Sequence, residues 1–459
     1  MTRLSVSSLA LACVCLCSSL SPAQRSLRET TNVDRTEQLR AAIQGGRAKH
    51  VILFLGDGMG DSEITIARNY RLGPNGRLAM DTLPLTGAYT TFALQESNPD
   101  VPDFVTDSAA SGTGWATGVK TSNGRISTVA ASTNVAPLTT ILELAQRAGF
   151  ATGDVTTADL TDATPAVLAS HVNNRGCYGP ADMRNCAVYK KSAGGPGSIA
   201  EQEVDHKVDV LMGGGYSRFA ETNDGGPFAG QTVLAQATAL GYQLIRTGND
   251  LQNTTPNVPV LGLFAAINMD LEFGGAAAQP YPGTGPQTCV EGVRPGNQPS
   301  LEDMTKRALF LLDQSTKGKQ TGFFLQVEGA SIDKQDHVSS PCQQIGETVA
   351  FDAAIAAGLE YARQNPDTLI VVTADHGHTS QIIDPPSSPA QPGAYSYIRT
   401  ANNGIMTVSY ASQPVGASQS HTGTQVRIAA QGPQAANVLG VTNQTELFYL
   451  LGRALGVTQ

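Results

Sequence analysis

The sequence has few charged residues and no excess of positive ones. Only 15% of its 459 residues are charged, and the formal net charge is −9. Nucleic-acid-binding proteins normally carry a basic stripe or patch, and the sequence contains no such run. The composition therefore argues against nucleic-acid-specific binding, and any recognition of phosphate must be local.

The sequence also lacks internal repeats, low-complexity tracts and an evident interdomain linker. Hydrophobic residues make up 41% of the chain and glycine occurs 48 times, which is typical of a globular, loop-rich protein. The length allows one large domain with insertions or two domains. The segment 385–393 is rich in Pro and Ser and is expected to be a surface insertion.

No apolar run beyond residue 23 is long enough to span a membrane. The N-terminus has the layout of a secretory signal peptide: Arg3, the apolar run "LALACVCLCSSL", then Ser21-Pro22-Ala23. We expect residues 1–23 to be removed and the mature chain to be soluble and exported, periplasmic or secreted. A lipid anchor on a leader cysteine is the alternative, but no convincing lipobox precedes one.

The chain has no C-x-x-C pair, which argues against zinc ligation by thiols. Outside the leader there are four cysteines, an even number that suggests two disulfides in an exported protein. Three pairings are possible. We favour Cys177 with Cys186, which closes a short loop, and Cys289 with Cys342.

Short, continuously apolar runs alternate with helix-like segments. Continuous apolarity indicates strands buried on both faces, which predicts an α/β fold with a central, mostly parallel sheet flanked by helices on both faces. The expected strands lie in residues 50–60, 208–215, 321–329 and 367–378. Helices are expected over residues 137–149, with Gly149 at the C′ position, and over residues 347–364.

Acidic residues fall directly after three of the apolar runs. Asp57, Glu328, and Asp375 with His376 are placed at the carboxyl ends of strands, where open α/β sheets bind ligands. For each residue alone, capping the next helix is the alternative.

Further possible metal ligands lie beside these positions. Asp333 and His337 are four residues apart, so one helical turn would face both to one side, and His421 lies in "SHTGTQ". Asp162 and Thr164 begin the segment "DATPAVLASHVNNR". Nitrogen with carboxylate suits zinc and all-oxygen sites suit magnesium, so more than one metal is implied.

Two other groups of residues have structural alternatives. Thr164, followed by Pro165, is expected to be a helix N-cap with Pro at N1, with or without a ligand role. His378 could contact a residue that binds a metal without binding the metal itself. The remaining histidines, His50, His171 and His206, are interpreted as structural or surface residues.

Five carboxylates would share one pocket if these segments converge. Burying that much unpaired charge is prohibitive, so cations must hold the carboxylates together or they do not converge. Bound divalent cations would also turn the pocket into an anion site.

The stretch "TDSAASGTG" (residues 106–114) contains a candidate nucleophile. Its small residues could bring backbone N–H groups close to a ligand, and a helix N-terminus is an anion site. Capping is assigned to Asp107 or the backbone, which leaves Ser108 free. Arg175 could present a bidentate fork to phosphate, although an isolated Arg is more often a surface or ion-pair residue.

The strings "DGMGDSE", "TDSAAS", "DATPA", "HVNNRGCYGP", "FFLQVEGASIDKQDH", "TADHGH" and "HTGTQVRIAAQGP" together resemble bacterial alkaline phosphatase, of the enterobacterial type. The resemblance runs in order from about residue 49 to about residue 455. It implies a single domain over 49–459 after an N-terminal arm (24–48), with a surface insertion around 384–419.

The resemblance also implies a site. Ser108 would be the phosphorylated nucleophile, Arg175 would clamp the phosphate, and Lys334 would assist substrate binding. Asp162 and Lys334 match a variant in which vertebrate members have histidine. Two Zn²⁺ and one Mg²⁺ per chain would be held by three ligand sets: Asp333, His337 and His421; Asp57, Asp375 and His376; and Asp57, Asp162, Thr164 and Glu328.

The implied activity is hydrolysis of a broad range of phosphate monoesters through a phosphoserine, by a homodimer. The disulfide pairing that the resemblance implies agrees with the pairing favoured above. A sulfatase would need a C/S-x-P-x-R context that is absent around Ser108. A non-catalytic metal- or phosphate-binding protein would need no nucleophile beside complete ligand sets.

Overall fold

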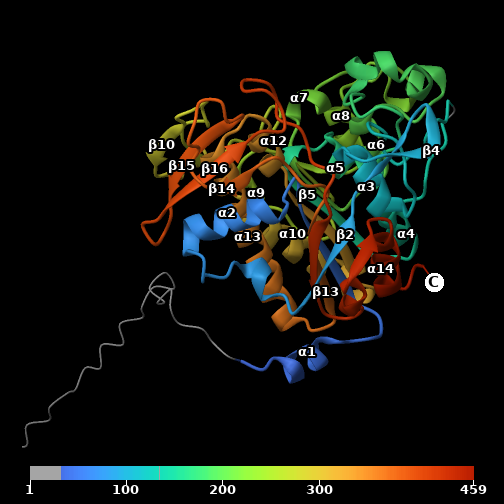
Figure 1. Ribbon diagram of the computed structural model, residues 1–459. Helices are drawn as coiled ribbons and strands as arrows, with labels where there is room; N and C mark the ends of the chain where they lie inside the picture. Colours follow the sequence, from blue (N-terminus) through green and yellow to red (C-terminus); the bar gives the residue numbers. More distant parts are fainter. Residues whose placement is uncertain (1–32, 134, 459) are drawn as a thin grey trace, which may run out of the picture.

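A ten-stranded sheet forms the centre of the protein (Figure 1). The structure is a computed structural model that describes residues 33–133 and 135–458, so the expected signal peptide (1–23) lies outside the described residues. In spatial order the strands are β18 (Val441–Asn443), β2 (Leu85–Thr90), β17 (Val426–Gln431), β13 (Thr368–Ala374), β1 (His50–Gly56), β12 (Phe323–Gly329), β5 (Ala151–Asp159), β6 (Val210–Gly214), β8 (Val260–Leu263) and β7 (Gln243–Ile245).

Within this sheet only β17 runs antiparallel to its neighbours. Every residue of β1, β12 and β13 is buried, as expected for parallel strands covered on both faces. The prediction of a mostly parallel central sheet is therefore confirmed, and the expected strands match β1, β6, β12 and β13.

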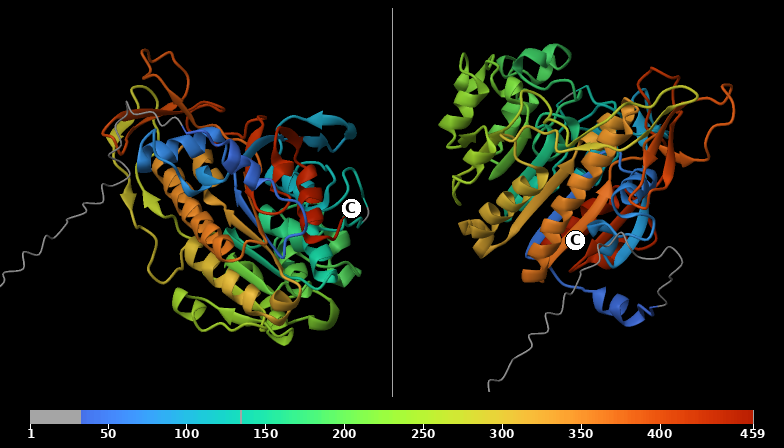
Figure 2. Two further views of the ribbon diagram at one scale, coloured as in Figure 1. Left: turned by 90° about the horizontal axis from the view of Figure 1, so that it is seen from below. Right: turned by 90° about the vertical axis from the view of Figure 1, so that its left-hand side faces the viewer.

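Helices cover both faces of the sheet (Figure 2). On one face, α10 (Leu301–Gln314) packs beside α13 (Pro341–Gln364) against β1, β5, β12 and β13. On the other face lie α4 (Ile141–Arg147), α5 (Ala163–Ala169) and α14 (Glu446–Leu455), with α3 (Ser108–Thr117) packed on α5 and α14. This layering matches the expected α/β class.

The two helices predicted from the sequence are present with shifted ends. α4 is shorter than the predicted segment, and Gly149 follows it with a φ of +87°, as a C′ glycine should. α13 begins six residues earlier than predicted, at Pro341, because proline suits the first turn of a helix, where N–H groups have no intrahelical partner.

A smaller four-stranded sheet lies beside the large one (Figure 1). Its order is β10 (Thr284–Gln287), β15 (Ala394–Arg399), β16 (Ile405–Tyr410) and β14 (Gln381–Ile383). Side chains of β15 and β16 form a second core with α2 (Asp61–Leu72), α13 and the cysteines Cys289 and Cys342. Within the segment around 384–419, residues 394–410 are thus largely strand.

The remaining elements are shorter connections and edge pieces. They include α1 (Thr36–Ala42), α6 (Ile199–Asp205), α7 (Tyr216–Phe219), α8 (Val233–Ala239), α9 (Gly248–Leu251), α11 (Thr316–Gln320), α12 (Ser331–His337), β3 (Ala93–Gln95), β4 (Asn98–Asp103), β9 (Phe273–Gly274) and β11 (Val290–Glu291). Across residues 33–133 and 135–458, no helix combines the length and apolarity that crossing a membrane requires.

The four cysteines beyond residue 23 form the two predicted disulfides, Cys177–Cys186 and Cys289–Cys342. They close loops of very different size, with sequence separations of 9 and 53 residues. Cys289 follows β10 of the small sheet and Cys342 lies on α13, so this disulfide links the second core to a helix that packs on the large sheet.

We predict that removing the Cys289–Cys342 bond destabilises the protein more than removing Cys177–Cys186. In the chain-entropy model the stabilisation is about 4 kcal/mol for the larger loop and about 2.6 kcal/mol for the smaller one. The paired Cys→Ser variants, compared by thermal unfolding under non-reducing conditions, should therefore differ in that order. An equal or reversed order would contradict the prediction.

Candidate active site

Strand register brings the predicted acidic residues to one edge of the sheet. Gly56 of β1 pairs with Gly329 of β12 and with Ala374 of β13. Asp57 and Asp375 therefore lie at the same level, one residue beyond these partners, and Glu328 lies one residue before Gly329, so all three are at the carboxyl ends of adjacent parallel strands. Asp162 comes just after β5, the next strand along.

A first cluster forms around Asp57. The Nε2 atom of His376 lies 3.1 Å from Oδ2 of Asp375 and 3.5 Å from Oδ1 of Asp57. Ser108 adjoins it: its Oγ lies 3.5 Å from Asp57 Oδ1 and 3.4 Å from His376 Nε2. All four side chains are buried. The proposed nucleophile thus lies against one of the proposed ligand sets.

A second cluster gathers around Asp333, on the first turn of α12. The Nε2 atoms of His337, His378 and His421 lie 3.2 to 3.3 Å from its carboxylate oxygens. The Nδ1 atoms of His337 and His421 face the backbone carbonyls of Gln419 and Thr106. A carbonyl can only accept a hydrogen bond, so each Nδ1 donates, and in the neutral ring Nε2 keeps a lone pair that can bind a metal.

His378 belongs to this cluster without matching that ligand pattern. Its Nδ1 accepts a hydrogen bond of 2.8 Å from the Thr379 N–H, so its Nε2 carries the proton and faces Asp333. The contact with Asp333 agrees with the expectation that His378 lies behind a metal ligand.

The two clusters adjoin each other. The imidazole rings of His376 and His421 are stacked, with centroids 3.7 Å apart. Glycine makes part of this closeness possible: a Cβ on Gly58 would lie 3.0 Å from the Cβ of Asp333, and Gly58 has a φ of +67°. The Gly58 N–H donates to Asp375 Oδ1 at 2.8 Å, which orients that carboxylate.

Asp162 connects the two basic residues of the site. One carboxylate oxygen accepts from Arg175 Nη2 and the other from Lys334 Nζ, each at 2.8 Å. Arg175 also donates to Asp107 at 3.2 Å, a contact that was not predicted from the sequence. Because the guanidinium is held by two carboxylates and remains 29% exposed, it is fixed in place and accessible from solvent.

The N-terminus of α3 holds Ser108 in position. Asp107 is the N-cap, and its side chain accepts from the Ala110 N–H at 2.9 Å, as the sequence suggested. Every residue of α3 is buried. A Cβ on Gly112 would meet Val167 of α5 at 2.9 Å, so the small residues after Ser108 allow the two helices to pack closely.

The prediction that Thr164 caps a helix is wrong. The N-cap of α5 is Asp162, whose carboxylate accepts from the Ala163 N–H at 2.8 Å, so Thr164 lies inside the first turn. Pro165 is still tolerated because N–H groups of the first turn have no intrahelical partner. The sequence does not distinguish the two caps, since Asp and Thr both serve as caps.

The charges in the site do not balance around the carboxylates. Burial, together with the neighbouring carboxylates of Asp333 and Asp375, raises the pKa of Asp57 well above its usual value. Burial raises the pKa of Glu328 to about 7. Burial opposes ionisation of Asp162 too, but Lys334 and Arg175 hold its pKa below the usual value. Lys334 opposes the shifts of Asp57 and Glu328 without cancelling them, so these are the acids whose charge the basic residues leave uncompensated.

Buried polar atoms without a hydrogen-bond partner support bound cations near these acids. Thr164 Oγ1 and Asp375 Oδ2 are buried and find no hydrogen-bond partner among the described residues. The hydroxyl of Thr156 donates to Glu328 and holds that carboxylate in place. Buried oxygens without donors beside uncompensated acids are suited to metal ligation. The residues present therefore fit divalent metal ions.

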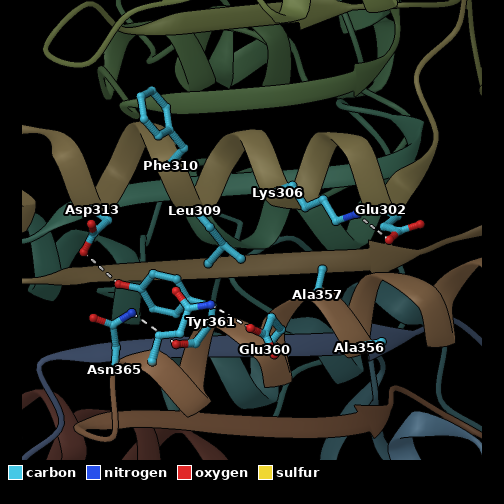
Figure 3. A pocket seen from close by; sticks show the side chains of 11 residues that line it. Glu302, Lys306, Leu309, Phe310, Asp313, Ala356, Ala357, Glu360, Tyr361 and Asn365 are labelled. Carbon is cyan, nitrogen blue, oxygen red and sulfur yellow. Dashed lines mark hydrogen bonds and ion pairs between the residues drawn. The ribbon is translucent and has the colours of Figure 1, made fainter. Parts of the chain in front are cut away.

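A groove lies elsewhere, between α10 and α13 (Figure 3). It has a volume of about 540 Å³, and its lining includes Leu309, Phe310 and Tyr361. Tyr361 donates to Asp313 at 2.8 Å across its floor. None of its lining residues is a predicted site residue.

Comparison with known proteins decides the family. The family model "Alkaline phosphatase" matches residues 48–417 and 398–457. The chain belongs to the alkaline phosphatase family. As a member of this family it is an enzyme, a phosphomonoesterase.

Individual relatives of the family cover most of the chain. It is 49% identical over 415 residues to streptomycin-6-phosphate phosphatase of Streptomyces griseus, covering 89% of this chain and 91% of that protein. It is 47% identical over 433 residues to alkaline phosphatase of Escherichia coli K12, covering 92% and 89%. Thermus thermophilus alkaline phosphatase shares the fold, with a TM-score of 0.68 at 23% identity over 94% of this chain and 96% of that one.

We predict that Asp107→Ala destabilises the protein by about 1 to 2 kcal/mol, because it removes the cap of α3. The substitution also removes the acceptor for the Gly124 N–H and one of the carboxylates on Arg175. Urea unfolding measures the loss. Asp100→Ala changes the charge equally at an exposed position and should stay within about 0.5 kcal/mol of the unsubstituted protein. Equal effects of the two substitutions would contradict the prediction.

Proposed function

We propose that this enzyme hydrolyses a broad range of phosphate monoesters through a phosphoserine on Ser108. The observation that carries the proposal is the position of the Ser108 hydroxyl. Ser108 is the first residue of the buried helix α3. Its Oγ lies 3.4 Å from His376 Nε2 and 3.5 Å from Asp57 Oδ1, and both residues belong to a possible metal site. A serine there can be activated by a metal without a Ser-His-Asp triad.

The same geometry supports an assignment of ions. One Zn²⁺ would be held by Asp333, His337 and His421, and a second by Asp57, Asp375 and His376. One Mg²⁺ would be held by the oxygens of Asp57, Asp162, Thr164 and Glu328. Nitrogen with carboxylate suits zinc, and all-oxygen sites suit magnesium. When bound, these ions supply Lewis acidity that lowers the pKa of a hydroxyl or a water and balances charge on phosphate.

The chain's own residues would bind the phosphoryl group. The first N–H groups of α3 and the guanidinium of Arg175 offer donors where negative charge accumulates on the equatorial oxygens. Asp107 and Asp162 hold the guanidinium in orientation. Lys334 contributes a further positive charge, which its contact with Asp162 keeps near the site.

The reaction has two displacements at phosphorus. The Ser108 oxygen forms a bond to phosphorus while the bond to the leaving alcohol breaks, and the alcohol departs with a proton. Water then forms a bond to phosphorus, the bond to Ser108 breaks, and inorganic phosphate leaves. Because recognition is directed at the phosphoryl group, the substrate range should be broad; the named substrate of the Streptomyces griseus relative is itself a phosphate monoester.

Export and assembly are further parts of the proposal. We infer that the protein is exported to the periplasm or secreted, because its two disulfides require an oxidising compartment. We also infer that it forms a homodimer, as its resemblance to bacterial alkaline phosphatase implies.

Replacing Ser108 by alanine should lower kcat for 4-nitrophenyl phosphate by several orders of magnitude, because the nucleophile is removed. Ser111→Ala, the same change one turn further along α3, should retain activity within a few fold. Acid quenching during turnover should show a phosphorylated Ser108 peptide by mass spectrometry in the unsubstituted enzyme. Near-normal turnover of Ser108→Ala would refute the assignment.

Chelation with EDTA should abolish activity, because acids whose charge Lys334 does not fully compensate repel each other and the phosphate. Zn²⁺ and Mg²⁺ added together should restore it, and Mg²⁺ alone should not. The melting temperature should fall on chelation and recover with the metals, because ions that bind only the folded state stabilise it. Full activity in protein shown to be metal-free by elemental analysis would refute the proposed ligand sets.

A further inference from the structure

Three side chains away from the active site form another compact cluster. Glu143 lies on α4, His171 follows α5, and His206 caps the C-terminus of α6. The Oε1 atom of Glu143 lies 3.2 Å from His171 Nε2 and 3.1 Å from His206 Nε2. Their possible ligand atoms all lie within 4.8 Å of one another. The residues are far apart in the sequence, so only the packing of three helices brings them together.

Backbone carbonyls determine which nitrogen of each ring faces the carboxylate. His171 Nδ1 lies 3.0 Å from the Ser127 carbonyl, and His206 Nδ1 lies 2.9 Å from the Gln202 carbonyl. Each Nδ1 must therefore donate, which leaves a lone pair on Nε2 in a neutral imidazole. In that state two nitrogen lone pairs and one carboxylate oxygen face one another, and either a metal ion between them or a proton on each ring resolves their repulsion.

Glu143 is held in place for this role by its other oxygen. Its Oε2 accepts from the Thr140 N–H at 3.0 Å, as part of the capping box of α4. Oε1 is left to face the two histidines. The carboxylate can therefore offer one oxygen to a cation while its orientation is maintained by the helix cap.

We propose that Glu143, His171 and His206 bind a zinc ion, separate from the ions of the active site. Two nitrogens and one carboxylate are a donor set that zinc takes, with bonds of about 2.0 to 2.2 Å. Tetrahedral geometry then separates neighbouring ligand atoms by about 3.3 Å, close to the 3.1 and 3.2 Å observed here.

The active site contains the same arrangement. His337 and His421 also direct Nδ1 to backbone carbonyls and Nε2 to a shared carboxylate, that of Asp333. Outer-shell carbonyls of this kind fix the ring orientation in zinc sites. The Glu143 cluster thus repeats, with different residues, the features by which the Asp333 cluster fits a metal.

The site remains open to solvent on one side. The side chain of His206 is 24% exposed, whereas that of His171 is 9% exposed. Three protein ligands leave a fourth position, which water can fill from the exposed side. An ion there would join α4, α6 and the end of α5, and so would stabilise the folded protein in proportion to its occupancy.

Protons are the competing occupant, because two imidazolium ions could pair with Glu143 instead. His206→Gln separates the two cases by metal content. The enzyme is stripped with chelator, reloaded with Zn²⁺ and Mg²⁺, and dialysed, and zinc per chain is measured by mass spectrometry. Lys207→Gln, at the exposed next residue, is the matched control.

The proposal expects one zinc fewer per chain in His206→Gln than in the unsubstituted enzyme and the Lys207→Gln control, with kcat unchanged in all three. Equal zinc content in the three proteins overturns the proposal. His206→Arg, which keeps a positive charge beside Glu143 but cannot bind zinc, should also lack one zinc and guards against misfolding of the first variant. Because phosphatase activity is measured in the same samples, failure here is distinct from failure of the proposed catalytic site.

Discussion

The convergence of carboxylates at one edge of the parallel sheet is the constraint on which the rest of the site depends. The register of β1, β12 and β13 places Asp57, Glu328 and Asp375 together in a buried environment. Buried carboxylates that lie close together cannot all remain ionised without cations beside them. Arg175 and Lys334 balance Asp162, and the remaining acids, with the imidazoles around Asp333, form groups that could hold metal ions.

This charge balance explains several features that appear unrelated in the sequence. Glycines at the strand ends and in α3 allow the backbone and neighbouring helices to approach closely enough for the clusters to adjoin. Asp107 both caps α3 and holds Arg175, so one carboxylate positions the helix of the proposed nucleophile and the guanidinium proposed to bind phosphate. The second core, joined by the Cys289–Cys342 disulfide, adds a small sheet beside the main one without entering the cluster of acids.

Much of the fold follows from local patterns. Continuous apolar runs predicted buried parallel strands because a strand covered on both faces has no polar side. The positions of Asp57 and Asp375 at strand ends followed from the same runs. The cap of α5 and the start of α13 were not predicted correctly, because Asp and Thr cap helices almost equally well and proline is compatible with a first turn.

By itself, the sequence determined the class of fold and the family and favoured the disulfide pairing that the structure shows, because these depend on residue type and on order along the chain. Only the tertiary structure decided which atoms face one another: the contact of Asp107 with Arg175, the contact of His378 Nε2 with Asp333, and the meeting of Glu143, His171 and His206. Taken singly, those histidines have ordinary structural interpretations. They become a candidate metal site because packing of three helices and hydrogen bonds to backbone carbonyls direct both Nε2 atoms to one carboxylate oxygen, an arrangement that spacing along a chain does not encode.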